Sequence, residues 1–180
     1  EFFRPAQVDP QGNFNNIAFG KNYQSPRLRL PGTGGIPDVT TFIDHIYLYV
    51  PRHSRLTFVP KLDFISGLGH HPKRTAGSGP VYLITDLGQF DFGDFKSDLA
   101  RMRLVSFHPG VELKQIQART GFEIDLAPDL HETPFPTEKE ITLLREVIDP
   151  LGIRKLEALS GVERRQLLAN IIEMESKSRM

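Results

Sequence analysis

The sequence predicts an α/β protein with an open, mainly parallel sheet flanked by helices and with a helical C-terminus. Residues 46–50, 81–87 and 102–107 are rich in β-branched, aromatic and aliphatic side chains and are bounded by Gly and Pro. Their continuous apolar character predicts strands that are buried on both faces, as parallel strands usually are. A short amphipathic segment, residues 111–119, follows the last of these strands and predicts a helix.

The connection after the first strand is short and polar. Residues 46–50 and 56–59 flank the tetrapeptide PRHS, which contains Pro51. Two apolar runs separated by a few polar residues are typical of a β-hairpin. The sequence therefore predicts a hairpin here, with Arg52 and Arg55 near its tip.

Two helix-start signals mark the last third of the chain. Thr137 and Glu140 have the spacing of a capping box, in which side chains satisfy the free N–H groups of a helix start, and Ser160 and Glu163 repeat it. The first helix should end before Asp149-Pro150. The second helix has an apolar face, formed by Leu167, Leu168, Ile171 and Ile172. Whether this face packs against the rest of the chain or against a partner subunit stays open.

Composition limits the classes of function. The 180 residues hold 22 basic and 22 acidic side chains, so the balanced charge predicts no nucleic-acid partner and no anionic membrane surface. The sequence has no cysteine, which excludes thiolate catalysis and thiolate metal sites in these residues. No apolar run approaches the roughly 20 residues that span a bilayer, and a cytoplasmic location is the expectation.

A glycine-rich segment is the most informative local feature. The string GTGG, residues 32–35, stands between a basic run and the first predicted strand. Glycine has no Cβ and tolerates positive φ, so backbone N–H groups there can approach a ligand oxygen closely. The segment is consistent with an anion or oxyanion cradle, and a tight turn without a binding role is the alternative.

Several segments together resemble a known family. Residues 5–16, 26–39, 81–92, 102–123 and 136–153, with the strings GTGG, HPGV, TGFE and IDPLGI, are similar to the β subunit of class I coenzyme A transferases of the glutaconate type. The resemblance implies the coenzyme A transferase fold over residues 1–153, with the N-terminal part of that domain missing. Residues 154–180 have no counterpart in it and are predicted to be a helical extension.

The resemblance implies an enzyme that transfers CoA between carboxylic acids through a glutamyl-CoA thioester. It also implies assembly with an α subunit in a heterotetramer or larger complex, with coenzyme A as substrate and no permanently bound cofactor. The nucleophilic glutamate of the family is expected upstream of Glu1. Two alternatives stay open: a hydrolase of a cyclic β-keto acyl-CoA that lacks the glutamate, and a non-catalytic partner subunit.

The same resemblance assigns site residues. Gly35, with Gly34, is expected to provide a backbone oxyanion donor for the thioester carbonyl. Asn13 and Asn15 lie in a turn-like segment that the family places near the active-site cleft. Arg55 is a candidate for the phosphates of CoA, because guanidinium groups match phosphate oxygens, and a solvated loop is its alternative role.

Histidines do not predict a metal site. His70 and His71 are adjacent, so their side chains diverge, and no third ligand stands at useful spacing. The loop that they begin, residues 70–74, is basic and is expected to be an exposed connection. His108 and Asp86 each follow a predicted strand, where structural roles in the turns are favoured over catalysis.

Overall fold

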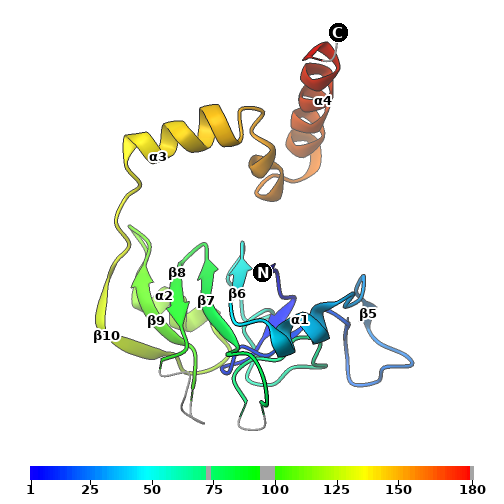
Figure 1. The fold of residues 1–180 in the computed structure, drawn as a ribbon, viewed down its shortest axis with the longest axis vertical. Helices are drawn as coiled ribbons and strands as arrows, with labels where there is room; N and C mark the ends of the chain where they lie inside the picture. Colours follow the sequence, from blue (N-terminus) through cyan, green and yellow to red (C-terminus); the bar gives the residue numbers. More distant parts are fainter. Residues whose placement is uncertain (72–73, 94–99, 179–180) are drawn as a thin grey trace. The chain divides into compact units, whose positions relative to one another are not determined.

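A six-stranded mixed sheet forms the centre of the first part of the chain (Figure 1). The computed structural model describes residues 1–71, 74–93 and 100–178. Along the sheet the order is β1 (Phe2–Phe3), β6 (Ile46–Val50), β7 (Pro80–Thr85), β8 (Gly88–Asp91), β9 (Arg103–Phe107) and β10 (Asp125–Glu132). Neighbours pair in parallel except at β8, which is antiparallel to β7 and β9. The predicted open, mainly parallel sheet is therefore confirmed.

The hydrophobic core covers one face of this sheet. In β6, Ile46, Leu48 and Val50 are buried, and Leu83 of β7 packs in the same cluster. Tyr82 and Ile84 on the alternate positions of β7 are 45% and 42% exposed. The prediction that β7 is buried on both faces is thus wrong. The buried residue of helix α2, Ile116, belongs to the same cluster as Leu83, so this helix adds to the core on the face that is already covered.

Two short hairpins precede β6. Strands β2 (Gln7–Val8) and β3 (Phe14–Asn15) pair antiparallel across a turn that places Gly12 at a φ of 76°. Strands β4 (Ala18–Phe19) and β5 (Leu28–Arg29) form the second hairpin. From β5 the chain runs through the glycine-rich segment into helix α1 (Ile36–Phe42) (Figure 1).

Helix α1 is not among the elements expected from the sequence. Its start has the composition of a helix N-terminus, with a proline in the first turn and Asp38 beside it. The expected helix after β9 is confirmed as α2 (Leu113–Arg119), whose buried side chain Ile116 lies in the core.

The predicted hairpin at residues 46–59 is wrong. After β6 the chain turns at Pro51, and the N–H of Phe58 donates to the carbonyl oxygen of Ser54 (2.8 Å). Phe58 forms an isolated parallel bridge to Val8 instead of pairing with β6. The ring of Phe58 is fully buried. The free energy gained by burying this large side chain in the core therefore outweighs the local preference of the segment to pair with β6 as a hairpin.

The C-terminal part contains α3 (Glu138–Thr142), a π-helical turn (Leu143–Ile148), a 3₁₀ turn (Ile153–Glu157) and α4 (Gly161–Ser178). The capping box of α3 is confirmed: the N–H of Glu140 donates to Thr137 Oγ1, and Glu140 accepts from the N–H of Thr137. On the apolar face of α4, Ile171 is buried, whereas Leu168 and Ile172 are 40% and 59% exposed.

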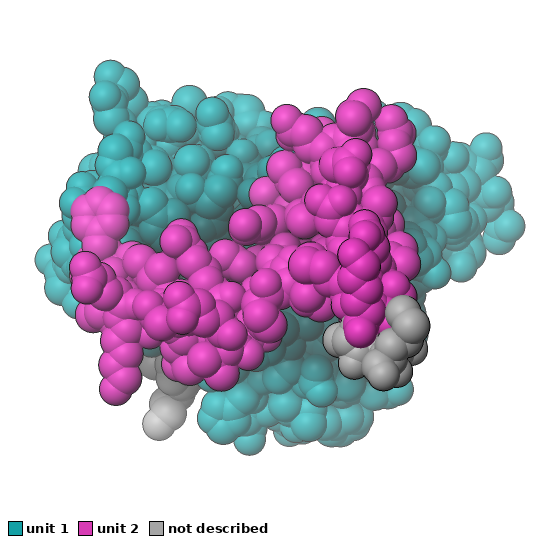
Figure 2. Space-filling model, turned by 90° about the horizontal axis from the view of Figure 1, so that it is seen from above, with its two compact units in different colours: residues 1–133 teal, residues 134–180 magenta. Residues whose placement is uncertain are grey.

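The chain divides into two compact units, residues 1–133 and residues 134–180 (Figure 2). The residues of the sheet and of the main hydrophobic cluster all belong to the first unit. The boundary at 133 reflects contacts within the chain, whereas the predicted boundary at 153 reflects the extent of a family resemblance. None of the helices in the described residues has the length and apolarity to cross a membrane.

Candidate active site

The glycine-rich segment forms an exposed turn. Its last residue, Gly35, directly precedes α1. Gly32 and Gly34 adopt positive φ values of 113° and 51°, which only glycine tolerates easily, while Gly35 has an ordinary φ of −83°. A Cβ added at Gly34 or Gly35 would meet no atom within 4 Å. Among the described residues, no oxygen accepts a hydrogen bond from the N–H of either glycine. Both amides are thus free to bind an oxygen that approaches from outside.

Helix α1, which carries this turn, is fixed at its far end. The buried hydroxyl of Thr40 accepts the N–H of Leu68 (3.0 Å) and donates to the carbonyl of Ile36 (2.7 Å). The guanidinium of Arg74 donates to the carbonyls of Thr40 (2.7 Å) and Thr41 (3.2 Å) and to three more in the adjacent loop, those of Leu68, Gly69 and Ala76. Arg74 therefore connects the helix to the loop instead of facing a ligand.

The basic loop of residues 70–74 differs from the expected exposed connection. His70 is buried, contacts the Phe92 ring at 4.9 Å between centroids, and its Nε2 lies 2.8 Å from the carbonyl oxygen of Pro80. Burial and the charge of Arg74 lower the pKa of His70. Pro72 and Lys73 of the same loop lie outside the described residues.

Asn13 lies in the interior, close to the first hairpin turn. Its N–H and its Nδ2 each donate to a different carboxylate oxygen of Asp9 (2.9 Å for both), and its Oδ1 accepts the N–H of Gly69 (2.8 Å). Burial raises the pKa of Asp9, and the bonds from Asn13 act in the opposite direction. These contacts hold the hairpin turn against the loop that also contacts α1.

Asn15 is fully buried, and its amide is saturated within the chain. Its Nδ2 donates to Gln7 Oε1 (2.7 Å) and to the carbonyl of Ala18 (2.8 Å), while its Oδ1 accepts from Ile17 and Ala18. Substrate contact by Asn13 and Asn15 stays a prediction. Their hydrogen bonds favour a role in shaping the loops around the site.

Arg55 lies at the surface, on the segment between β6 and Phe58. It lines a groove of 510 Å³ together with residues of the β4–β5 hairpin, including Lys21 and Arg27. The structure therefore brings Arg55 together with two further cations that the sequence alone did not connect to it. Phosphate binding by Arg55 stays a prediction.

A buried polar network lies at the carboxyl ends of β6, β7 and β9, and sequence reasoning missed its central residue, His53. The imidazole Nε2 lies 2.9 Å from Thr120 Oγ1, and Nδ1 lies 3.3 Å from Thr85 Oγ1. Thr120 Oγ1 donates to the carbonyl of Ile116 (2.8 Å), and Thr85 Oγ1 donates to that of Gly88 (3.3 Å), so both hydroxyls tie the imidazole to the backbone. Burial, aided by the charge of Arg119, lowers the pKa of His53 to about 4.

The ring of His53 also stacks on Phe58, with the centroids 3.7 Å apart. Asp86, as expected for a turn residue, accepts the N–H of His53 (2.7 Å). His108 follows β9, and its Nε2 donates to the carbonyl of Thr85 (3.0 Å) while Nδ1 lies 3.1 Å from Thr133 Oγ1. Both histidines are thus engaged through both ring nitrogens, an arrangement that rigidifies this edge of the sheet.

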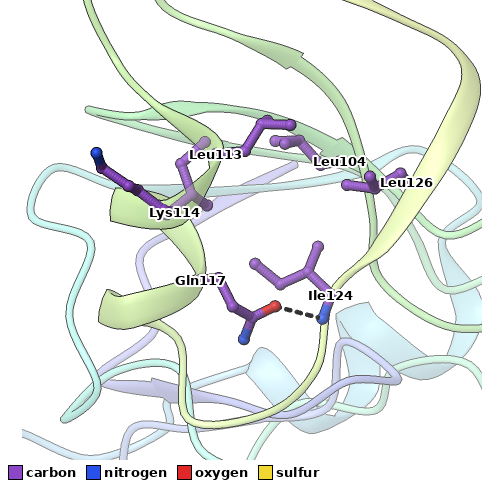
Figure 3. Close-up of a pocket in the computed structure, with 7 residues that line it drawn as sticks. Leu104, Leu113, Lys114, Gln117, Ile124 and Leu126 are labelled. Carbon is purple, nitrogen blue, oxygen red and sulfur yellow. Dashed lines mark hydrogen bonds between the residues drawn. The ribbon is translucent and has the colours of Figure 1, made fainter.

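A separate apolar pocket of 240 Å³ lies between α2, β9 and the start of β10 (Figure 3). Leu104, Leu113, Ile124 and Leu126 form most of its wall, and the side chain of Gln117 closes one side by accepting the N–H of Ile124 (3.1 Å). The one charged group in the lining, Lys114, pairs with Glu112. The pocket offers no nucleophile or acid–base pair for acyl chemistry.

Metal-binding geometry is likewise lacking in the described part of the chain. No three side chains of His, Asp or Glu converge there. Backbone amides of the kind found at Gly34 and Gly35 are groups that can stabilise a developing negative charge without a metal.

Comparisons with known proteins agree with the fold. No protein-family model matches the chain. It is 38% identical over 151 residues to the β-type subunit of the 3-oxoadipate CoA-transferase from Pseudomonas knackmussii, a match that covers 80% of this chain and 56% of the relative. The solved glutaconate CoA-transferase of Acidaminococcus fermentans superposes with a TM-score of 0.72 at 28% identity, over 83% of this chain and 58% of that one.

The cholesterol ring-cleaving hydrolase subunit IpdB of Rhodococcus jostii is 35% identical over 159 residues, covering 84% of this chain and 60% of the relative. The IpdAB structure from this organism superposes with a TM-score of 0.75 at 32% identity, over 86% of this chain and 62% of that one. The chain thus spans somewhat more than half the length of the curated relatives it matches.

The mixed sheet, the glycine turn before α1 and the superpositions define an α/β subunit of the coenzyme A transferase fold. Within that class, the chain is similar to B subunits of CoA-transferases, at 38% identity to that of the 3-oxoadipate enzyme and 29% to that of the glutaconate enzyme of A. fermentans.

Proposed function

We propose that this chain is part of the β subunit of an enzyme that transfers coenzyme A between carboxylic acids. Its homology to transferase β subunits supports the reaction class. The single structural observation that carries the proposal is the pair of free, sterically open amides at Gly34 and Gly35. Donors of this kind stabilise the oxyanion that forms when a thioester is attacked.

The proposed reaction proceeds by covalent catalysis. A glutamate carboxylate, supplied from outside residues 1–180, attacks the thioester carbonyl and releases the CoA thiolate, which leaves a mixed anhydride. The thiolate then attacks the glutamyl carbonyl, releases the first acid and forms a glutamyl-CoA thioester. The acceptor carboxylate repeats these two steps in reverse, so that CoA passes to it and the glutamate is regenerated.

The residues of this chain would act by binding and orientation. The N–H of Gly35, assisted by that of Gly34, would hold the oxyanion of each tetrahedral species. Thr40 and Arg74 would keep α1 in place, and therefore the turn at its start. Asn13 and Asn15 would shape the neighbouring loops or contact the acyl group, and Arg55 would contact a phosphate of CoA.

The proposal includes an α subunit as partner, in a heterotetramer or larger assembly, and coenzyme A as substrate without a permanently bound cofactor. The matched IpdAB and glutaconate CoA-transferase structures support a related two-subunit enzyme. A cytoplasmic location belongs to the same proposal, and so does a function without metal, nucleic acid or membrane.

A second candidate is a hydrolase of a cyclic β-keto acyl-CoA, in which water takes the place of the acceptor acid. The 35% identity to the ring-cleaving hydrolase subunit of R. jostii favours this candidate. The same oxyanion donors would serve it, but no glutamyl thioester would form. A non-catalytic partner subunit is the third candidate.

The experiment uses the complete gene product co-expressed with an α-type subunit from the same organism. Short and dicarboxylic acyl-CoAs are incubated with and without an acceptor acid, and both new thioester and free CoA are measured. A transferase should form acceptor thioester and be inactivated by hydroxylamine or borohydride only after incubation with acyl-CoA. Release of free CoA without acceptor, and without such inactivation, would establish the hydrolase instead.

The substitution Gly35→Val tests the donor assignment. Because φ is −83° and the added Cβ meets no atom, the variant should fold normally while its side chain keeps the acyl oxygen from the amide. Turnover should fall by about 100-fold or more.

Gly110→Val is the control, since Gly110 also faces open space but has a φ of 79°. It should lose stability and retain turnover. Normal turnover of Gly35→Val would remove the proposed oxyanion role.

A further inference from the structure

The groove beside the β4–β5 hairpin has the chemistry of an anion-binding site. Lys21 and Arg27 from the hairpin face the same space as Arg55 from the segment after β6. None of these three cations forms an ion pair with a described residue. Because the whole chain carries no net charge, this is a local excess of positive charge.

One acidic residue of the groove offsets only part of this charge, because three cations face a single carboxylate. Asp63 also lines the space, but its Oδ2 accepts the N–H of Gly20 (2.9 Å) and the Nε2 of Gln7 (3.3 Å). It thereby fixes the turn that carries Lys21. A second groove meets the first at Phe19 and adds Arg52 to the same surface.

The groove also has apolar walls. Leu28 and Leu56 are 53% and 77% exposed, and Phe19 lines both this groove and the adjoining one. The Arg27 guanidinium lies 6.0 Å from the centre of the Phe19 ring. Apolar surface beside unpaired guanidinium groups suits a ligand that combines a flat ring with phosphates.

The position of the groove relates it to the glycine turn. Strand β5 supplies Leu28, and Gly35 follows only seven residues later, so the two points lie no more than about 25 Å apart. A ligand with a long flexible arm can therefore place one end in the groove and a reactive group at the turn.

We propose that this groove binds the phosphorylated nucleotide end of the acyl-CoA substrate, with Arg27 and Arg55 on phosphate oxygens, Lys21 beside them, and the adenine against Phe19 and Leu56. The assignment rests on the proposed function, because it takes the substrate to be a CoA thioester. It names two residues, Lys21 and Arg27, and a ring contact that the sequence did not indicate.

Direct binding tests the groove apart from catalysis. Using the complete two-subunit enzyme, the affinities for CoA, dephospho-CoA and adenosine 3′,5′-bisphosphate are measured by calorimetry for the wild type and for Lys21→Ala, Arg27→Ala and Arg55→Ala. Each variant should bind CoA about tenfold more weakly or worse, and the salt dependence of binding should decrease. Arg165→Ala, an exposed cation on α4, is the control and should bind normally.

The outcomes separate this proposal from the reaction class. Weaker CoA binding in the groove variants supports the groove even if the enzyme hydrolyses acyl-CoA or transfers nothing. In an active enzyme the variants should raise KM for acyl-CoA and leave kcat nearly unchanged. Unchanged CoA affinity in all three variants would overturn the proposal, as would loss of α-subunit assembly with CoA affinity retained in the assembled fraction.

Discussion

The imidazole of His53 links three parts of the chain through one buried side chain. It contacts Thr85 at the end of β7, Thr120 after α2 and the ring of Phe58. Only 3% of the residue is exposed. A second ring proton would charge a buried group that lies near the cationic Arg119, which explains why the pKa of His53 falls to about 4.

This residue predicts a pH dependence of folding stability. Between pH 6.5 and about 4 the unfolded chain binds a proton on His53 that the folded chain does not, so stability should decrease as the pH falls through this window. The loss should be roughly 3 kcal/mol, and the lowered pKa of His70 acts in the same direction. Urea unfolding at several pH values from 7 to 4.5 measures it.

The variant His53→Gln should be less stable at pH 7 but show a flatter pH profile. His131→Gln, at an exposed position, is the control and should keep the wild-type slope. The raised pKa of Asp9 opposes the histidines, because the folded chain then holds a proton above the ordinary value of 3.8 that the unfolded chain has lost. An unchanged slope in His53→Gln would show that other groups cause the dependence.

At the level of elements, α1 depends on its neighbours for stability. A helix of seven residues is marginal by itself in water. Its last carbonyls, those of Thr40 and Thr41, are satisfied by Arg74, and its buried hydroxyl binds Leu68. The glycine turn therefore takes its position from a guanidinium that lies 34 residues away from Thr40 in sequence.

Replacing this guanidinium should loosen α1 without unfolding the sheet. Arg74→Met leaves several carbonyls unsatisfied and should lower the stability of α1 by about 2–4 kcal/mol. Hydrogen exchange of the α1 amides should speed up accordingly, while exchange in β6 and β9 stays slow. Arg101→Met, which removes an exposed ion pair with Asp125, should leave α1 unchanged. Unchanged exchange in α1 of Arg74→Met would contradict the anchoring role.

At the scale of the whole molecule, the hydrophobic core belongs to one unit. Every buried residue of the main cluster, from Val8 to Ile124, lies within residues 1–133. The second unit has exposed apolar side chains on its π-helical turn and on α4, among them Val147, Ile148 and Ile172.

A fragment of residues 1–133 should fold without the second unit. Because it keeps the whole cluster and all six strands, its unfolding midpoint should lie within a few degrees of that of the full chain. Thermal unfolding followed by near-ultraviolet circular dichroism measures this midpoint. Loss of the cooperative transition would show that residues 134–180 complete the core.

Features that depend on local pattern were predictable from the sequence. Strands β6, β7 and β9, helix α2 and the capping box at Thr137 follow from side-chain periodicity and from the chemistry of helix ends. The glycine turn was likewise visible, since three glycines within four residues mark a backbone with unusual freedom. The resemblance to transferase β subunits rested on strings of this local kind.

Only the tertiary structure decided how distant residues combine. It buried Phe58 instead of pairing its segment with β6, enclosed His53 against Thr120 67 residues away, and turned Arg74 inward onto α1. It also gathered Lys21, Arg27 and Arg55 in one groove. Local sequence sets backbone preferences, whereas such partners are selected by burial and by the need of each enclosed polar group for a hydrogen bond, which depend on the complete fold.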